Sequence, residues 1–126
     1  MTPEGFAKTF ANIFATQDSA ALVAMLAMDA QVVTLTGAVA EDATQAGEVF
    51  GQEFAGIFAA AKLVTGRNRI RGLGPGVAMV HQRYVVIGAR DETGRDLPRF
   101  GAAMTAVLLT TAQGWRVVSL TLASVT

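Results

Sequence analysis

The sequence predicts an α+β fold in which amphipathic helices pack on a strongly curved antiparallel sheet. In much of the first half, apolar side chains recur at helical spacing, whereas the second half consists of long runs rich in β-branched residues. Short turns separate these runs, and short links imply antiparallel hairpins because parallel pairing needs a long crossover. The length of 126 residues is that of one ordinary domain, so we expect residues 1–126 to share one core.

Three helices are predicted in the first half. The first should follow the cap Thr2 and extend to about Thr16, since a proline and an acidic residue come directly after that threonine. Asp18 offers the cap of a second, shorter helix. Asp42 offers the cap of the third and longest, whose apolar spacing continues to about Ala61.

Two features of the third helix bear on packing and exposure. Gly47, Gly51 and Gly56 each weaken a helix, so a packing reason is expected there, such as a close approach to the sheet. Gln52 and Glu53 lie on the same helix, where exposure to solvent is the default expectation.

Five strands are predicted from runs of β-branched residues bounded by turn residues. The first is short and ends at the turn residue Gly37. Four long strands should cover 63–73, 77–87, 99–111 and 115–125.

The two faces of this sheet are both expected to be largely apolar. Strict alternation in the last strand puts Ser119 and Thr121 on one face and the neighbouring apolar residues on the other. Helices can cover only one side of a sheet, so an uncovered apolar face predicts association. We expect a homodimer through Val107, Leu109, Val118, Leu120 and Leu122. The alternative is that loops or the first helix fold over this face.

The order of elements resembles the nuclear transport factor 2-like superfamily, specifically its SnoaL-like and SgcJ/EcaC-type members. Residues 24–37 read AMLAMDAQVVTLTG, Val77 and Ala78 open a middle strand, and Gly114 and Trp115 form the last turn, as is typical of those members. The resemblance spans the whole chain. It implies a cone-shaped α+β fold of three helices and a curved, barrel-like sheet, with a pocket inside and a dimer on the outer sheet face.

This chain lacks the acids and bases that the characterised members of that superfamily use. Isomerase-like members have a proton-abstracting aspartate where this chain has Thr34, and their second acid aligns near Ala106. Their first-helix tyrosine falls within Phe10–Phe14, and the final-strand histidine of many SnoaL-like chains is Thr121 here. The resemblance therefore implies the pocket without the usual acid–base set.

His81 and Arg83 are the remaining candidates for chemistry. They lie two apart on one strand and so share a face, which the alignment of Val77 and Ala78 makes the concave one. His81 would act as a general base, or the two would bind an anion. The alternative is a structural histidine beside a solvent-exposed arginine.

Other side chains are candidates for ligand contact alone. Thr34, Ser119 and Thr121 offer hydroxyls, and Trp115 is expected as a packed aromatic at the pocket mouth. The alternating arginines of the 63–73 strand fit a solvated outer face better than an anion site. These are Arg67, Arg69 and Arg71.

Composition excludes several classes of function. Ten basic and ten acidic residues cancel, and the lysines and arginines form no face-long cluster with interleaved aromatics, so nucleic acid is not an expected partner. There are no cysteines and one histidine, so neither a metal nor another cofactor is expected. No apolar run reaches the length of a membrane span and no signal peptide is evident, so we expect a cytoplasmic protein that does not contact membranes.

The sequence thus predicts a dimeric protein with a pocket for a small apolar or anionic molecule. The alternative is an isomerase, cyclase or hydrolase in which His81 is the general base and Arg83 steadies negative charge.

Overall fold

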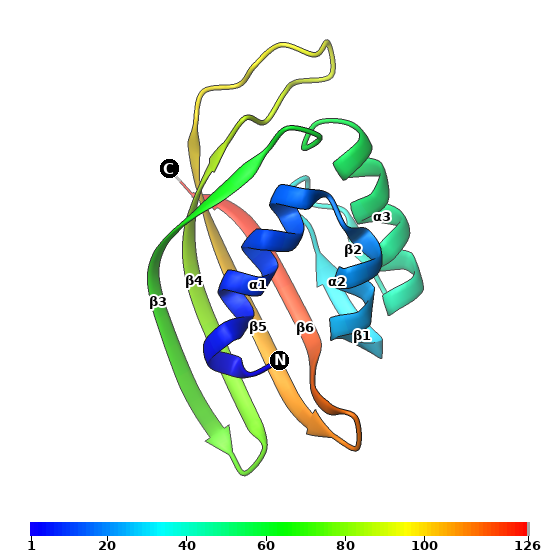
Figure 1. Ribbon diagram of the computed structural model, residues 1–126, viewed down its shortest axis with the longest axis vertical. Coiled ribbons are helices and arrows are strands. Elements are labelled where there is room, and N and C mark those ends of the chain that lie inside the picture. The colour runs from blue at the N-terminus through cyan, green and yellow to red at the C-terminus, as the bar shows by residue number, and fades with distance from the viewer. Residues whose placement is uncertain (126) are drawn as a thin grey trace.

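The computed structural model describes residues 1–125 and contains one curved, six-stranded mixed sheet with three helices against its concave face (Figure 1). The strand order is β2-β1-β6-β5-β4-β3, with β1 and β6 parallel and the other neighbours antiparallel. The elements are α1 Pro3–Thr16, α2 Ser19–Met25, β1 Leu26–Val33, β2 Val39–Ala40, α3 Ala43–Ala55, β3 Lys62–Gly74, β4 Val77–Ile87, β5 Phe100–Thr111 and β6 Gly114–Val125. The predicted α+β class is confirmed.

Each helix begins at its predicted cap. The backbone N–H of Gly5 donates to the Thr2 hydroxyl, and that of Ala21 donates to the Asp18 carboxylate. The N–H of Gln45 donates to the Asp42 carboxylate at 2.8 Å. These bonds satisfy amides that the helices leave without partners.

Two boundaries differ from the prediction. Helix α3 ends at Ala55 instead of near residue 61, because Gly56 leaves the helical conformation and the chain turns through residues 56–61. Strand β1 starts at Leu26, directly after α2, and pairs irregularly with β6 between Leu26 and Gln31.

Gly47 permits a close contact, but with a helix and not with the sheet. A Cβ atom at Gly47 would lie 2.7 Å from Cγ2 of Val23 on α2. The expected packing reason is thus found at Gly47, although the close neighbour is α2 and not the sheet.

A β-bulge in β6 decides which side chains face the helices. Val107 pairs with Ser119 but Leu108 pairs with Val117, so Val118 is an extra residue that reverses the alternation. Downstream of this bulge, Leu120 and Leu122 point into the core and are 0% and 3% exposed.

The predicted outer face is therefore wrong for Leu120 and Leu122. Val107 and Leu109 do lie on the outer face, and both are half-buried, as is Val118 in the bulge. Ser119 and Thr121, expected to point inward, are paired with Val107 and Thr105 on the outer face.

Aromatic side chains fill the space between the helices and the sheet. Phe10 of α1 has ring centroids of Phe6, Phe14, Phe50 and Tyr84 at 6.1 to 6.3 Å. All five side chains are at most 2% exposed. The middle of the concave face is thus packed core.

Candidate functional site

A buried carboxylate lies where β1 ends against the last turn of α3. Glu53 belongs to the buried stripe of α3, three residues after Phe50 and next to Phe54, and is 8% exposed. The expectation that Glu53 is solvent-exposed is wrong. Helical spacing accounts for this, because a residue three positions from Phe50 shares its face.

Two threonines just after β1 hold one oxygen of this carboxylate. The hydroxyl of Thr34 donates to Oε2 of Glu53 at 2.7 Å, and that of Thr36 donates to the same atom at 2.8 Å. The two hydroxyl oxygens are 3.1 Å apart. Gly37, with φ of 85°, forms the turn that brings both threonines to the helix, and its N–H donates to the Thr34 carbonyl.

The other oxygen, Oε1 of Glu53, is buried and has no hydrogen-bond partner among the described residues. A buried polar atom left unpaired costs about 1–3 kcal/mol, and more when it is charged. Such an atom in a folded protein calls for an explanation, and a bound ligand is one.

An apolar pocket of about 400 Å³ lies where β5 begins and β6 ends, and we call it the end pocket; Glu53 is not among its lining residues. Thr36 is shared, since it lines the end pocket and bonds Glu53. The remaining lining residues are mostly apolar: Leu35, Ile57, Phe58, Leu97, Phe100, Ser124 and Val125.

Tyr84 is the other buried titratable group of the interior, and it is structural. Its hydroxyl donates to the Ala7 carbonyl of α1 at 2.7 Å, which ties β4 to that helix. Burial raises the pKa of Tyr84, so the phenol stays protonated and remains a donor.

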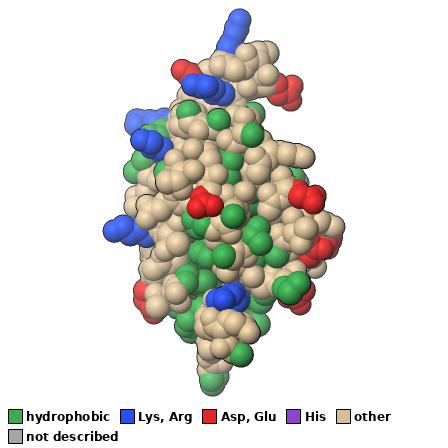
Figure 2. All heavy atoms as spheres, turned by 45° about the vertical axis from the view of Figure 1, so that its right-hand side comes forward, with side chains coloured by type: hydrophobic (Ala, Val, Ile, Leu, Met, Phe, Trp, Pro, Cys, Tyr) green, Lys and Arg blue, Asp and Glu red, His purple; other side chains and the backbone are tan. Residues whose placement is uncertain are grey.

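The structure separates the side chains that the sequence grouped as a site. His81 and Arg83 are exposed, whereas their neighbours Val80, Gln82 and Tyr84 are buried toward the helices. The predicted inward orientation of His81 and Arg83 is therefore wrong, because the alternation of β4 sends them outward. Figure 2, which views the helical side, shows no histidine.

The other predicted ligand contacts are also dispersed. Thr34 is 1% exposed and bonds Glu53, as described above. Trp115 is half-buried near Pro3 and Gly74, at the opposite end of β6 from Ser124, and lines a separate pocket. Ser119 and Thr121 lie on the outer face.

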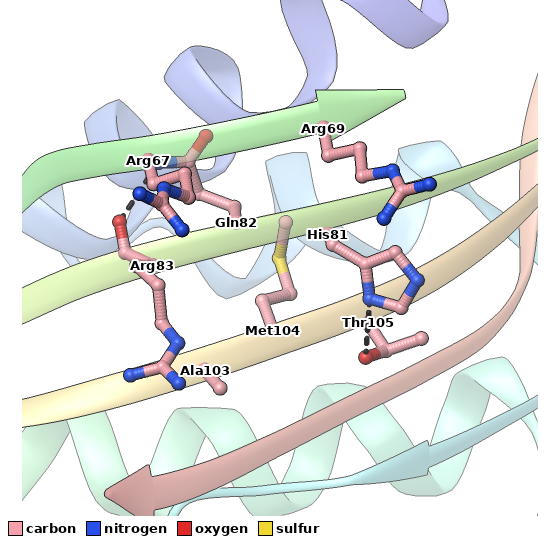
Figure 3. Close-up of a pocket in the computed structure, with 8 residues that line it drawn as sticks. All are labelled: Arg67, Arg69, His81, Gln82, Arg83, Ala103, Met104 and Thr105. Carbon is pink, nitrogen blue, oxygen red and sulfur yellow. Dashed lines mark hydrogen bonds between the residues drawn. The ribbon is translucent and has the colours of Figure 1, made fainter. Parts of the chain in front are cut away.

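His81 and Arg83 instead line a hollow on the outer face of β3, β4 and β5 (Figure 3). Its other polar lining residues include Arg67, Arg69 and Thr105. Three of the basic residues of the chain therefore gather around one hollow of this face.

The residues missed by sequence reasoning are Glu53 and Thr36. A signal for Glu53 was present, because an acidic residue interrupts an apolar stripe that continues on both sides through Phe50, Phe54 and Ile57. No comparable signal marks Thr36, whose contact depends on the turn at Gly37.

The described part of the chain holds neither a membrane-spanning helix nor a group of metal ligands. Within residues 1–125, no helix combines the length and apolarity needed to cross a membrane. Over the same residues, no three histidine, cysteine or acidic side chains are grouped as metal ligands.

The architecture matches many solved structures, although no family model and no curated protein matches the chain. An uncharacterized protein with a cystatin-like fold from Caulobacter vibrioides has a TM-score of 0.88 at 16% identity, over 98% of this chain and 87% of that one. An NTF2-like protein with a cystatin-like fold from Novosphingobium aromaticivorans has a TM-score of 0.75 at 18% identity, over 94% and 77%.

An NTF2-like protein of unknown function in nutrient uptake from Rhodospirillum rubrum matches with a TM-score of 0.76 at 19% identity, over the full length of both chains. At these identities the likeness establishes the fold alone. This protein has the cystatin-like, NTF2-like fold, and the predicted resemblance is confirmed at that level.

Proposed function

We propose that this protein binds a small, mainly apolar molecule in the end pocket, with Glu53 accepting a hydrogen bond from it. The observation that carries the proposal is that Thr36 both lines the apolar end pocket and bonds Glu53, whose Oε1 is buried without a partner. Its volume of about 400 Å³ falls in the usual range of ligand pockets, roughly 300–1,000 Å³.

The polar requirements of the ligand follow from those of the site. Glu53 already accepts two hydroxyl bonds on Oε2, so its free oxygen needs a donor such as an ammonium or hydroxyl group. The apolar body of the ligand would contact Phe58, Phe100 and Leu97. A carboxylate ligand is disfavoured because it would place two acceptors against each other.

Calorimetric titration with three probes of equal chain length tests this selectivity. Octylamine and octanol should bind, and octanoate should bind more weakly. Glu53→Gln should lower the affinity for octylamine about tenfold, since a charge-assisted hydrogen bond is lost. The affinity for octanol should fall less.

The matched control is Glu48→Gln, which makes the same change at an exposed position of the same helix. Ser124→Phe, at the rim of the end pocket, should fill it and abolish binding of all three probes. Equal affinity for all three probes in the parent protein and in Glu53→Gln would contradict the proposal.

A catalytic role, if the protein has one, falls to Glu53 instead of His81. The carboxylate is bonded to Thr34, the position where the resemblance puts the proton-abstracting acid of isomerases. A general base must lie within hydrogen-bonding reach of the proton it removes, and His81 is on the opposite face of the sheet. Deuterium exchange next to the carbonyl of an aliphatic ketone, followed by NMR, should be faster with the parent protein than with Glu53→Gln.

Homodimerisation through the outer face is the second part of the proposal. Val107, Leu109 and Val118 support it, since they leave apolar surface uncovered on β5 and β6. Sedimentation velocity should show a dimer for the parent protein and a monomer for Val107→Lys, because a two-fold contact would bring two added charges together. A parent protein that sediments as a monomer would reject this part alone.

A further inference from the structure

The outer face of the sheet carries an arginine hollow of about 330 Å³, defined by Arg67, Arg69, His81, Arg83 and Thr105. Ala103 is among the other lining residues, and its small side chain leaves space between the longer ones. Figure 3 shows Arg67 and Arg83 toward one end of the hollow and Arg69 beside His81 toward the other. The hollow is separate from the end pocket, because the two have no lining residue in common.

Strand register places the side chains of the hollow next to one another. Arg69 pairs with His81, which pairs with Thr105, and Thr105 pairs with Thr121 on the next strand. Arg83 faces the bulge of β3 that contains Arg67. Like charges opposite one another destabilise a sheet, so the juxtaposition of Arg67 and Arg83 is expected where a counter-ion offsets the repulsion.

No carboxylate among residues 1–125 supplies that counter-charge. Strands β3, β4, β5 and β6 contain no aspartate or glutamate, although they contain six lysines and arginines. Among residues 1–125, the only ion pair joins Arg90 and Asp96 in the loop before β5. The guanidinium groups of Arg67, Arg69 and Arg83 therefore lack an acidic partner in the described chain.

The imidazole of His81 is oriented within the hollow. Its Nδ1 lies 3.3 Å from the Thr105 hydroxyl, which leaves Nε2 without a hydrogen-bond partner among the described residues. The hollow thus offers an imidazole nitrogen and three guanidinium forks to one occupant.

We propose that the arginine hollow binds a phosphate group. Guanidinium matches the geometry of phosphate oxygens and donates to them in pairs, and several arginines together suit a multiply charged oxyanion. A small phosphate-bearing molecule fits better than a nucleic acid strand, because the cationic groups are confined to one hollow and the protein has no net charge.

NMR of His81 tests the proposal directly, because it is the only histidine and gives a single, assigned Hε1 signal. Titration with inorganic phosphate at constant ionic strength and pH should shift this signal along a saturable curve. Arg69→Gln and Arg83→Gln should each weaken the affinity about tenfold or more, the effect of losing one charge-assisted hydrogen bond. Arg69→Lys should recover part of the loss.

Arg71→Gln is the matched control. Arg71 is exposed on the same face of the same strand but pairs with Met79 and does not line the hollow. If the hollow is a site, Arg71→Gln should change the affinity for phosphate less than twofold. A loss of affinity equal to that of Arg69→Gln would mean that phosphate is held by general charge attraction, and it would overturn the proposal. A shift that never saturates, or that chloride reproduces at equal concentration, would overturn it as well.

Two further titrations identify the source of the phosphate. Tighter binding of phenyl phosphate than of inorganic phosphate indicates an organic phosphate ester, and the reverse order indicates the free ion; either supports the site. A single-stranded oligonucleotide that binds far more tightly than both, with equal losses in Arg69→Gln and Arg71→Gln, would replace the small-molecule site by a nucleic-acid surface.

Discussion

Glu53 combines burial, two hydroxyl donors on one oxygen and no partner on the other, and efficient packing alone does not produce that combination. Burying an unpartnered polar atom lowers stability, and functional sites often carry such a cost. The residue is therefore better explained by what it binds than by what it stabilises.

We expect Glu53→Gln to raise the free energy of unfolding by about 1 kcal/mol, because a neutral amide is easier to bury and its oxygen can still accept from Thr34 and Thr36. Urea denaturation measures the change. Glu48→Gln should alter stability by less than about 0.5 kcal/mol, as is usual for an exposed position. A loss of stability in Glu53→Gln would mean that the carboxylate is mainly structural.

The raised pKa of Tyr84 predicts that the free energy of unfolding falls at alkaline pH. Because burial raises the pKa of Tyr84, the unfolded chain ionises first as the pH rises through the ordinary tyrosine value of about 10. The contribution of Tyr84 is thus complete below that pH and is lost progressively above it. Urea denaturation at a series of pH values should show a steeper alkaline loss for the parent protein than for Tyr84→Phe; parallel curves would disprove the assignment.

At the level of elements, turn residues made the strand ends predictable and bulges made the faces unpredictable. Gly76 and Gly114 have positive φ angles of 69° and 95° in the two tight turns, which only glycine adopts readily. The bulge at Val118 has no comparable signature, since a valine is equally suited to regular strand. One inserted residue was enough to exchange the predicted sides of Ser119 and Leu120.

Alanine substitutions on either side of the bulge test the observed register. Leu120→Ala should lower the free energy of unfolding by about 2–5 kcal/mol, because it opens a cavity in the core. Ser119→Ala, one residue away on the outer face, should change it by less than about 0.5 kcal/mol. Denaturation curves with comparable losses for both variants would show that the strand is placed wrongly.

The resemblance to a known fold predicted the helices, the curved sheet and the general place of Thr34, but not the source of the nearby carboxylate. The resemblance implies an acid on the strand at the position of Thr34, whereas the acid that contacts Thr34, Glu53, belongs to α3. The contact joins residues 19 apart in the chain, so neither local spacing nor motif could show it. His81 was misplaced because the inward side of β4 was inferred from an alignment of two residues.

On the scale of the whole molecule, charge is divided between the two halves of the chain. Residues 1–61 hold one basic residue, Lys8, and seven acidic ones: Glu4, Asp18, Asp29, Glu41, Asp42, Glu48 and Glu53. Residues 62–126 hold the other nine basic residues and three acidic ones. Figure 2 shows several of the acidic side chains along the right-hand edge of the helical side. The net charge of zero does not reveal this division, but a count of charged residues in each half of the sequence does.

The two proposed sites lie on separate surfaces, one at the end of the cone and one on the outer face of the sheet. The end pocket is lined mainly by apolar residues, whereas the arginine hollow is lined by three arginines and by no acidic residue. Ligands of opposite character are expected at the two places, so binding at one can be measured without the other.

The position of octylamine in its complex tests the central claim most directly. Intermolecular nuclear Overhauser effects should connect its alkyl chain to Ile57, Phe58 and Phe100, with the ammonium group nearest Glu53. The same experiment on Ser124→Phe should show none of these contacts. Contacts from the bound chain to Trp115 or to the outer strand face, with none to Phe58, would show that the end pocket is not the binding site.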